Sequence, residues 1–365
     1  MGRRLTVDVV GCGEIAQLMH LPHLLELSDA CEVRAICERD PHVLKTVADR
    51  FGIEGAFTDH REMLAQSPAD VLVVLTSGDH VTLINDAIDA GMDVFVEKPL
   101  CYSTEDAWAI ARRAEEAGRT VMVGYSRLFD TAFDDLKAAL GREQGPIYLR
   151  AEASLPWDYY YRAHHDIVRP LDWAPPATVV EDRAPSWGGS WEFFREELLF
   201  NLAIHEVYCL RVLTGIDRPE IRTVSDVLDR RGIEATWSGG GAGGLDGEGV
   251  HASMSVLTLD TVAGGYVEEF RAVTGASTYL LEYPSIYLKS WPAKLSRSTV
   301  QDGTLVSSST LGSFVDPFKA ELEHFFAVLT EGVPCVSTAA DAALDVETLN
   351  RLYEAARAHG KTIAG

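Results

Sequence analysis

The sequence lacks several features that would place a protein in a class at once. Its six cysteines include no C-x-x-C pair, and its 32 lysines and arginines form no basic run against 55 aspartates and glutamates. Scattered cysteines in a chain of this length favour reduced, buried thiols over disulfides. A net charge of −23 repels phosphate backbones and anionic lipids, so we expect no nucleic-acid partner and no membrane partner.

Long apolar runs and internal repeats are also lacking. Arg3 and Arg4 precede the apolar stretch 5–10, but Asp8 interrupts that stretch and Glu14 follows it. The stretch is too short for a signal segment or a membrane span. We therefore expect a soluble, cytoplasmic protein, and 365 residues suffice for two domains.

Short apolar runs alternate with helical patterns through residues 1–124. Strands are expected near 5–10, 33–37, 71–76, 94–96 and 121–123, with helices over 14–28, 41–51, 60–66, 80–90 and 104–117. Short buried strands that alternate with helices are typical of an α/β fold with a parallel, doubly wound sheet. We predict this fold for the N-terminal part of the chain.

The pattern changes after residue 124. A helix is expected over 196–214, strands over 250–260, 262–272 and 277–288, and further helices over 317–330 and 338–359. Alternation of apolar and polar residues in these strands predicts a mainly antiparallel sheet. The glycine-rich stretch 239–249 has no strand-to-helix frame around it, so we interpret it as a hairpin tip and not as a phosphate loop.

The segment Gly11-Cys12-Gly13-Glu14-Ile15-Ala16 follows the first expected strand and opens the first expected helix. It has the form G-x-G-x-x-A. The first glycine permits a tight turn, the second lets the backbone approach a pyrophosphate, and the alanine allows close packing of helix on strand. An anion there would lie at a helix N-terminus. The segment predicts dinucleotide binding.

Glu38 stands at the end of the second expected strand, 25 residues beyond Gly13. A carboxylate at this position can accept hydrogen bonds from the adenosine ribose hydroxyls. It would repel a 2′-phosphate, whereas the neighbouring Arg39 could pair with one. We expect NAD as the cofactor and leave NADP open.

Two further groups could carry chemistry. Glu97-Lys98-Pro99 directly follows an apolar strand, so Lys98 is expected at the sheet edge where ligands of doubly wound folds bind. Asn201 and His205 stand four residues apart in a helical stretch, hence on one face. Histidine suits proton transfer near neutral pH, although a helix histidine can also be purely structural.

Together these motifs resemble the Gfo/Idh/MocA family, named after glucose-fructose oxidoreductase and inositol dehydrogenase. The matching pieces are the glycine turn, Glu38, Thr76-Ser77-Gly78-Asp79-His80, Ala90-Gly91 through Glu97-Lys98-Pro99-Leu100, Gly124-Tyr125-Ser126-Arg127, Asn201-Leu202-Ala203-Ile204-His205 and Leu213-Thr214-Gly215. The resemblance implies a Rossmann domain over 1–124 and a substrate-binding, oligomerising α/β domain over 125–365. That second domain would carry an open, mainly antiparallel sheet, with C-terminal helices over 317–359 packing back.

The resemblance also implies an enzyme that oxidises a secondary alcohol of a sugar, glycoside or cyclitol with NAD(P), as a homodimer or homotetramer. In family terms Lys98 and His205 are the catalytic pair. Many members carry Asp where this chain has Asn201, which leaves the proton route open. The cofactor residues implied are Gly11, Cys12, Gly13, Glu14, Ile15, Glu38, Arg39, Thr76, His80, Glu97 and Lys98. The substrate residues expected are Tyr125, Arg127, Trp157, Arg162, Asn201 and His205.

The region 157–194 is rich in aromatic residues and could form a wall that stacks on sugar faces, or could simply pack as core or interface. His164, His165 and Asp166 lack a well-spaced third ligand, and His20 and His23 are better explained as structural, so we expect no metal. Two other functions stay open. One is a redox-neutral glycosidase or lyase that oxidises its sugar transiently, and the other is a regulator that binds dinucleotide without turnover.

Overall fold

In the computed structural model the chain divides into two compact units, which are described separately. The structure describes residues 3–67, 69–156, 164–173, 190–239, 249–259 and 265–360. The first unit comprises Met1–Ser126, His165–Ala174 and Phe318–Val346, and the second comprises Arg127–His164, Pro175–Pro317 and Glu347–Gly365. The first unit thus takes in two segments that lie far along the chain from its main part.

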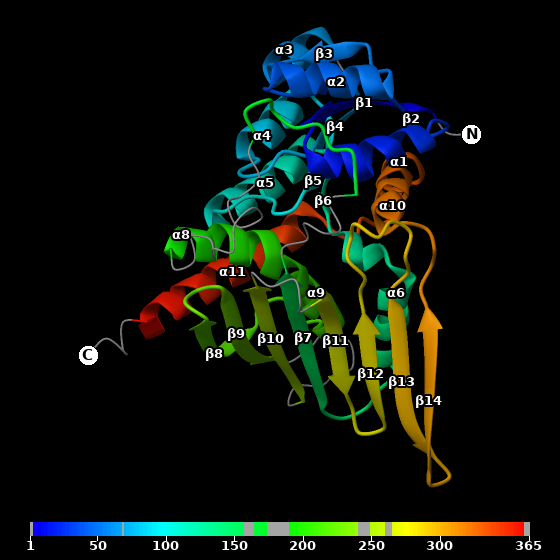
Figure 1. The fold of residues 1–365 in the computed structure, drawn as a ribbon, viewed down its shortest axis with the longest axis vertical. Helices are drawn as coiled ribbons and strands as arrows, with labels where there is room; N and C mark the ends of the chain where they lie inside the picture. The colour runs from blue at the N-terminus through cyan, green and yellow to red at the C-terminus, as the bar shows by residue number, and fades with distance from the viewer. Residues whose placement is uncertain are drawn as a thin grey trace. The chain divides into compact units, whose positions relative to one another are not determined.

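The first unit contains a six-stranded parallel sheet (Figure 1). Its strands are β1 (Leu5–Val10), β2 (Cys31–Cys37), β3 (Gly55–Phe57), β4 (Val71–Val74), β5 (Asp93–Glu97) and β6 (Val121–Gly124). They are arranged in the order β3-β2-β1-β4-β5-β6, which is the order of a doubly wound dinucleotide fold. All four residues of β4 are fully buried, as expected of a central parallel strand. The predicted Rossmann architecture is confirmed.

The described helices of this unit include five that connect these strands and one, α10, from the C-terminal part of the chain. They are α1 (Leu21–Glu26), α2 (Pro41–Phe51), α3 (His60–Gln66), α4 (Val81–Asp89), α5 (Thr104–Ala117) and α10 (Pro317–Glu331). Several begin at a side-chain cap: Asp40 accepts from the Val43 N–H of α2, and Ser103 accepts from the Asp106 N–H of α5. Such caps satisfy backbone donors that a helix leaves unpaired at its start. These local signals explain why α2 and α5 begin at the predicted residues.

The helix after the glycine turn departs from regular α geometry. A π-helical segment η1 (Ala16–His20) precedes α1, within the single helix expected over 14–28. Figure 1 shows α10 beside α1, and Lys319 of α10 donates a hydrogen bond to Glu26 at the end of α1. Within the first unit, a helix from the C-terminal part of the chain therefore packs beside the first helix of the Rossmann fold.

The second unit contains an eight-stranded sheet in the order β14-β13-β12-β11-β7-β10-β9-β8 (Figure 1). Its strands are β7 (Ile147–Pro156), β8 (Glu220–Val227), β9 (Gly232–Gly239), β10 (Val250–Leu259), β11 (Val267–Val273), β12 (Ser277–Glu282), β13 (Lys294–Gln301) and β14 (Thr304–Leu311). β10 pairs with β7 in parallel, while the other neighbouring pairs of described strands are antiparallel. The predicted mainly antiparallel sheet is confirmed.

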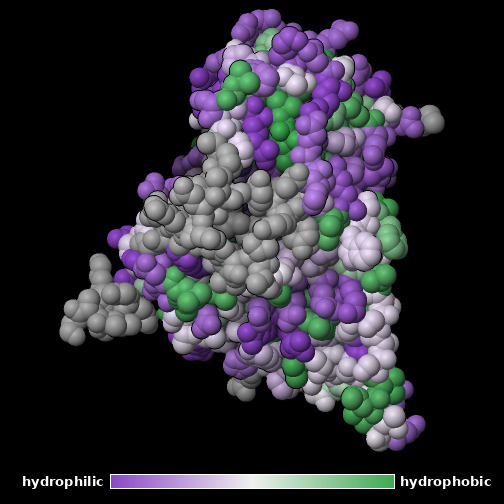
Figure 2. Space-filling view, in the orientation of Figure 1, coloured by the Kyte–Doolittle hydropathy of each residue, from purple (hydrophilic) through white to green (hydrophobic). Residues whose placement is uncertain are grey.

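One face of this sheet packs against helices of the same unit. They are the short turn η2 (Ser126–Phe129), α6 (Thr131–Leu140), α8 (Trp191–Phe193), the π-helical η4 (Phe194–Ala203) and α9 (Ile204–Thr214), and α11 (Ala339–Gly360) extends into this unit. Along β7, Leu149 and Ala151 are buried, whereas Tyr148 and Arg150 on the other face are exposed. Figure 2 shows apolar side chains at the tip of the β13–β14 hairpin, where Val300 and Leu305 are exposed.

Several expected bounds shift. The strand expected over 277–288 ends at Glu282, because residues 286–290 form turns, and the described part of the strand expected over 262–272 begins at Val267. Gly239 pairs with Val250 in antiparallel register, which supports the predicted hairpin, while its tip at 240–248 lies outside the described residues.

Candidate functional site

The glycine turn lies at the C-terminal end of β1, where β1 and β4 are neighbours. Gly11 has φ +95°, and a Cβ there would lie 2.7 Å from the backbone of Leu75 and Thr76. A Cβ on Gly13 would meet no atom within 4 Å. Gly11 is therefore required by the close approach of the loop after β4, whereas Gly13 faces open space. This arrangement fits a turn that a pyrophosphate can approach.

Glu38 lies against the same turn. Its Oε2 accepts a hydrogen bond from the Cys12 N–H at 3.0 Å, and its Oε1 accepts from the Asp40 N–H at 3.1 Å. The carboxylate therefore lies beside the glycine turn, where a ribose diol would find an acceptor. Arg39 is exposed. The Cys12 thiol is fully buried. Burial raises its pKa far above the usual range, and the nearby negative charge of Glu38 adds to this effect.

Glu14 and Ile15 begin the helical segment after the turn. The Glu14 carboxylate accepts a hydrogen bond from Arg169 at 3.2 Å. One turn further, Gln17 exchanges hydrogen bonds with the backbone of Val168, both at 2.9 Å. The segment 165–173 of the first unit thus lies along this helix. Sequence reasoning missed these contacts, because residues so far apart in the chain give no local signal.

His80 links two loops at the carboxyl edge of the parallel sheet. Its Nδ1 lies 2.9 Å from the Pro99 carbonyl oxygen, and its Nε2 lies 2.7 Å from the carbonyl oxygen of Thr76. The side chain is fully buried. The loop after β4 is thereby tied to the Glu97-Lys98-Pro99 turn, and both were assigned from the sequence to the cofactor region.

Glu97 and His20 form a buried pair at the end of β5. Glu97 Oε1 lies 2.7 Å from His20 Nε2, and Glu97 Oε2 accepts the Lys98 backbone N–H at 3.1 Å. Burial acts to raise the pKa of Glu97, but the hydrogen bond and charge of His20, together with Lys98, lower it below its usual value. A carboxylate is thus held directly beside Lys98, whose side chain is half-buried.

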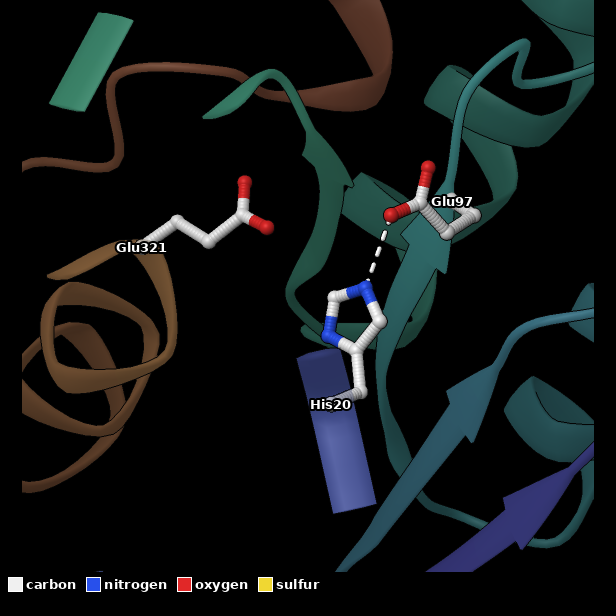
Figure 3. A group of neighbouring side chains, drawn as sticks. All are labelled: His20, Glu97 and Glu321. Atoms are coloured by element: carbon white, nitrogen blue, oxygen red, sulfur yellow. Dashed lines mark hydrogen bonds and ion pairs between the residues drawn. The ribbon is translucent and has the colours of Figure 1, made fainter. Parts of the chain in front are cut away.

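A second acidic side chain approaches this pair. Figure 3 shows the Glu321 carboxylate extending from α10 toward the His20 imidazole, opposite Glu97. Ligand atoms of His20, Glu97 and Glu321 lie within 4.8 Å of one another, and all three residues are buried. One imidazole and two carboxylates form the group of described residues that could hold a metal ion. Sequence reasoning placed His20 as structural and did not connect it with either glutamate.

Elsewhere in the first unit, Asp166 from the His164-His165-Asp166 run accepts a hydrogen bond from Arg50 at 2.9 Å. Trp173 lies under the Arg169 guanidinium, 4.4 Å from ring centroid to Cζ. Tyr125 at the end of β6 is fully buried. Trp157 and Arg162, both expected near the substrate, lie outside the described residues.

In the second unit, Asn201 and His205 lie where η4 passes into α9. Asn201 donates to Glu197 Oε2 at 3.1 Å, one turn toward the N-terminus. His205 Nδ1 lies 3.0 Å from the hydroxyl of Tyr208, one turn further along α9. His205 is half-buried and Tyr208 is fully buried. Because Asn201 lies in the π-helical segment and His205 in the α-helix that follows it, their placement on one helix face stays a prediction.

Arg127 is also in the second unit. Its guanidinium donates to both carboxylate oxygens of Glu268, at 2.6 and 2.7 Å, and it lies over the Tyr283 ring. Tyr266 donates a further hydrogen bond to Glu268. Burial opposes the charge of Arg127, but Glu268 raises its pKa well above the usual value. The fork of Arg127 thus holds a buried carboxylate, which the sequence could not reveal.

No helix of the described residues is long and apolar enough to cross a membrane.

Comparison with known proteins addresses the first unit most directly. Residues 5–125 match the family model described as "Oxidoreductase family, NAD-binding Rossmann fold". The chain is 33% identical over 155 residues to scyllo-inositol 2-dehydrogenase (NAD(+)) of Bacillus subtilis (strain 168), covering 41% of this chain and 44% of that protein. The match therefore spans less than half the length of this curated relative.

Solved structures match nearly the whole chain. UDP-N-acetylglucosamine 3-dehydrogenase from Acidithiobacillus ferrooxidans superposes with a TM-score of 0.73 at 16% identity, covering 98% of this chain and 99% of that one. Levoglucosan dehydrogenase in complex with NADH gives 0.75 at 15% identity, covering 97% of each. At such low sequence identity, these superpositions show that the chain shares the fold of these proteins. The N-terminal part of the chain, residues 5–125, is thus similar to the NAD-binding Rossmann domain of the Gfo/Idh/MocA oxidoreductase family.

Proposed function

We propose that this protein transfers a hydride between a secondary alcohol of a sugar, glycoside or cyclitol and a nicotinamide cofactor. The observation that carries the proposal is the glycine turn, with open space at Gly13 and the Glu38 carboxylate against the Cys12 N–H. The names of the relatives, an inositol dehydrogenase and a levoglucosan dehydrogenase, support the substrate class.

Residues 1–124 would bind the dinucleotide. The N–H groups at the start of the helix after Gly13 would hold the pyrophosphate, with Glu14 and Ile15 at that helix start. Glu38 would accept hydrogen bonds from the ribose hydroxyls. Its negative charge would disfavour a 2′-phosphate, so we propose NAD as the preferred cofactor. When bound, the cofactor supplies the acceptor or donor of the hydride.

The chain's own residues would handle the proton. We propose that His205 accepts the proton of the substrate hydroxyl, while Lys98 donates a hydrogen bond to the same oxygen and stabilises its developing negative charge. A positioned acid–base group contributes roughly 10²- to 10⁴-fold to rate. Asn201, an amide where many family members carry Asp, would bind substrate without adding charge.

Residues 125–365 would contribute the substrate side and the assembly of subunits. Tyr125, Arg127, Trp157 and Arg162 stay proposals as substrate residues, and Arg127 would act by fixing Glu268 and Tyr266. The face of the eight-stranded sheet that carries Tyr148 and Arg150 is exposed. This face would form the interface between subunits of a homodimer or homotetramer.

The test is the absorbance of reduced nicotinamide when the purified protein is given NAD or NADP with a panel of pyranosides, glycosides and inositols. Turnover with one substrate class, lost in His205→Ala while the cofactor still binds, is the expected result. Release of an aglycone without net reduced cofactor would replace the proposal with the redox-neutral eliminating reaction. Cofactor binding without any turnover, unchanged in Lys98→Ala and His205→Ala, would favour a regulator.

A further inference from the structure

Tyr208 contacts the histidine proposed as the base. The two side chains stand three residues apart on α9, so they lie on the same helix face. Tyr208 Oη lies 3.0 Å from His205 Nδ1, and the two rings meet edge to face with centroids 5.7 Å apart. This contact engages Nδ1, and through the tautomer of the imidazole it also bears on the protonation of Nε2.

Tyr208 is held in a buried, charged surrounding within the second unit. Burial raises the pKa of its phenol well above the usual value. The neighbouring Cys209 and Glu268 add to this effect, and the positive charge of Arg127 opposes it. Arg127 and Glu268 are themselves locked in a bidentate ion pair. The phenol therefore stays neutral, and its oxygen can exchange a hydrogen bond with an imidazole nitrogen without adding a negative charge.

A neutral imidazole carries one proton, on either Nδ1 or Nε2, and the partner of one nitrogen selects the tautomer. If Nδ1 carries the proton and donates it to the Tyr208 oxygen, Nε2 has a lone pair and can accept a proton from substrate. If Tyr208 donates to Nδ1 instead, Nε2 carries the proton and cannot act as a base. The direction of this one hydrogen bond therefore decides the role of His205.

We propose that Tyr208 is a positioning residue that accepts the Nδ1–H of His205 and so keeps Nε2 as the proton acceptor. The inference rests on the proposed function, because it explains how His205 would be poised for it. It assigns to a phenol the orienting task that a carboxylate performs in many histidine-based enzymes. The amide of Asn201, one turn before His205, donates to Glu197.

The tautomer can be observed without any substrate. Protein labelled with ¹⁵N-histidine gives two-bond proton–nitrogen spectra in which the protonated ring nitrogen is recognised by its shift. His205 is assigned by the signals that disappear in His205→Asn. At alkaline pH we expect the Nδ1–H form in the wild type and a shift toward the Nε2–H form in Tyr208→Phe. An Nε2–H form in the wild type would overturn the proposal, and so would a tautomer ratio that Tyr208→Phe leaves unchanged.

The matched control is Tyr279→Phe. Tyr279 is another buried tyrosine of the second unit, and its hydroxyl donates to Glu143 at 2.6 Å. Removing that hydroxyl is the same chemical change, so a general effect of losing a buried phenol would appear there too. We expect the His205 signals to be unaltered in this control. An equal shift in both variants would contradict the proposal, and the wild-type spectrum decides the tautomer even where a variant folds poorly.

Kinetics provide the second readout once a substrate is known. We expect Tyr208→Phe to lower kcat about ten- to a hundredfold, with KM and cofactor affinity changed less than about twofold. Equal losses in KM and kcat, or no loss, would contradict a positioning role. The two proposals fail separately: an Nδ1–H tautomer in a protein without turnover removes the oxidoreductase proposal alone, whereas turnover with the Nε2–H tautomer removes only this one.

Discussion

The imidazole of His20 and the carboxylate of Glu97 form a buried hydrogen-bonded pair, with 2.7 Å between Nε2 and Oε1. The pair joins the π-helical segment after the glycine turn to the end of β5, directly before Lys98. Its aromatic neighbours are Phe95 and Phe318, with ring centroids 5.4 and 5.5 Å from that of His20. Because the pair is buried among aromatic rings, the loss of either member is expected to lower the free energy of unfolding.

His20→Ala should therefore destabilise the protein. It leaves the buried carboxylate of Glu97 without its imidazole partner, a change that costs about 3 kcal/mol or more. His60→Ala is the matched control, because His60 pairs with Asp86 at 2.8 Å in a more exposed position. That control should cost about 1 kcal/mol or less. Urea unfolding of both variants makes the comparison, and equal losses would contradict the account.

The two glycines of the turn should separate stability from cofactor binding. Gly11→Ala puts a methyl group 2.7 Å from backbone atoms at φ +95°, so it should lower the unfolding free energy by about 2 kcal/mol or more. Gly13→Ala meets no atom, so its stability should stay within about 0.5 kcal/mol of the wild type. Because that methyl group occupies the path of the pyrophosphate, NADH affinity should fall about tenfold or more. Thermal unfolding and NADH fluorescence titration measure both effects, and a Gly13→Ala protein with full affinity would argue against the turn as the phosphate site.

Glu38 should set the preference between NAD and NADP. Glu38→Gln keeps the size of the side chain but removes the charge that disfavours a 2′-phosphate. The ratio of NAD to NADP affinity should fall about tenfold, which corresponds to about 1.4 kcal/mol. Glu32→Gln is the control, since Glu32 is an exposed acid at the start of the same strand, β2. Titration with both cofactors measures this ratio. A similar change of the ratio in Glu32→Gln would show that the overall charge of the protein, and not Glu38 itself, sets the preference.

Much of this site could be predicted from the sequence, for a local reason. The glycine turn, the apolar strand β1 and the capped helices α2 and α5 depend on neighbours in the chain, so their bounds follow from short-range signals. Glu38 directly follows β2, as expected, and lies beside the turn because β1 and β2 are neighbouring parallel strands, while its role toward the ribose stays a prediction.

The contacts that sequence reasoning missed are long-range or depend on orientation. His20 meets Glu97 across 77 residues and Arg127 meets Glu268 across 141, and no periodicity reports such pairs. The contact between Tyr208 and His205 could have been predicted, because a histidine and a tyrosine three residues apart on a helix share a face. The sequence alone gave no reason to prefer that neighbour over Asn201 on the other side.

Asp8 should make stability depend on pH. Burial raises its pKa from 3.8 to about 7, and the charge of Arg34 and the hydrogen bond from Ser67 offset this only in part. An acid with a raised folded pKa stabilises the fold fully below its unfolded pKa and loses that contribution as pH rises toward 7. At about 1.4 kcal/mol per unit, the loss is at most about 4 kcal/mol.

Urea unfolding between pH 4 and 8 tests this, with Asp8→Asn expected to flatten the decline. Asp70→Asn is the opposite control. Burial acts to raise the pKa of Asp70, but hydrogen bonds from Thr6 and the charge of Arg3 lower it overall, so its contribution is lost as pH falls. The same pH slope in both variants would contradict the assignment to Asp8.

The most direct test of the central claim follows the hydride itself. A pyranoside or inositol that carries deuterium on the carbinol carbon is incubated with the protein and NAD, and the cofactor is examined by mass spectrometry. The account predicts one deuterium on the nicotinamide ring of the reduced cofactor, and its loss in His205→Ala at unchanged NAD affinity. Turnover of substrate with no deuterium ever appearing on the nicotinamide, even in a single turnover, would contradict it.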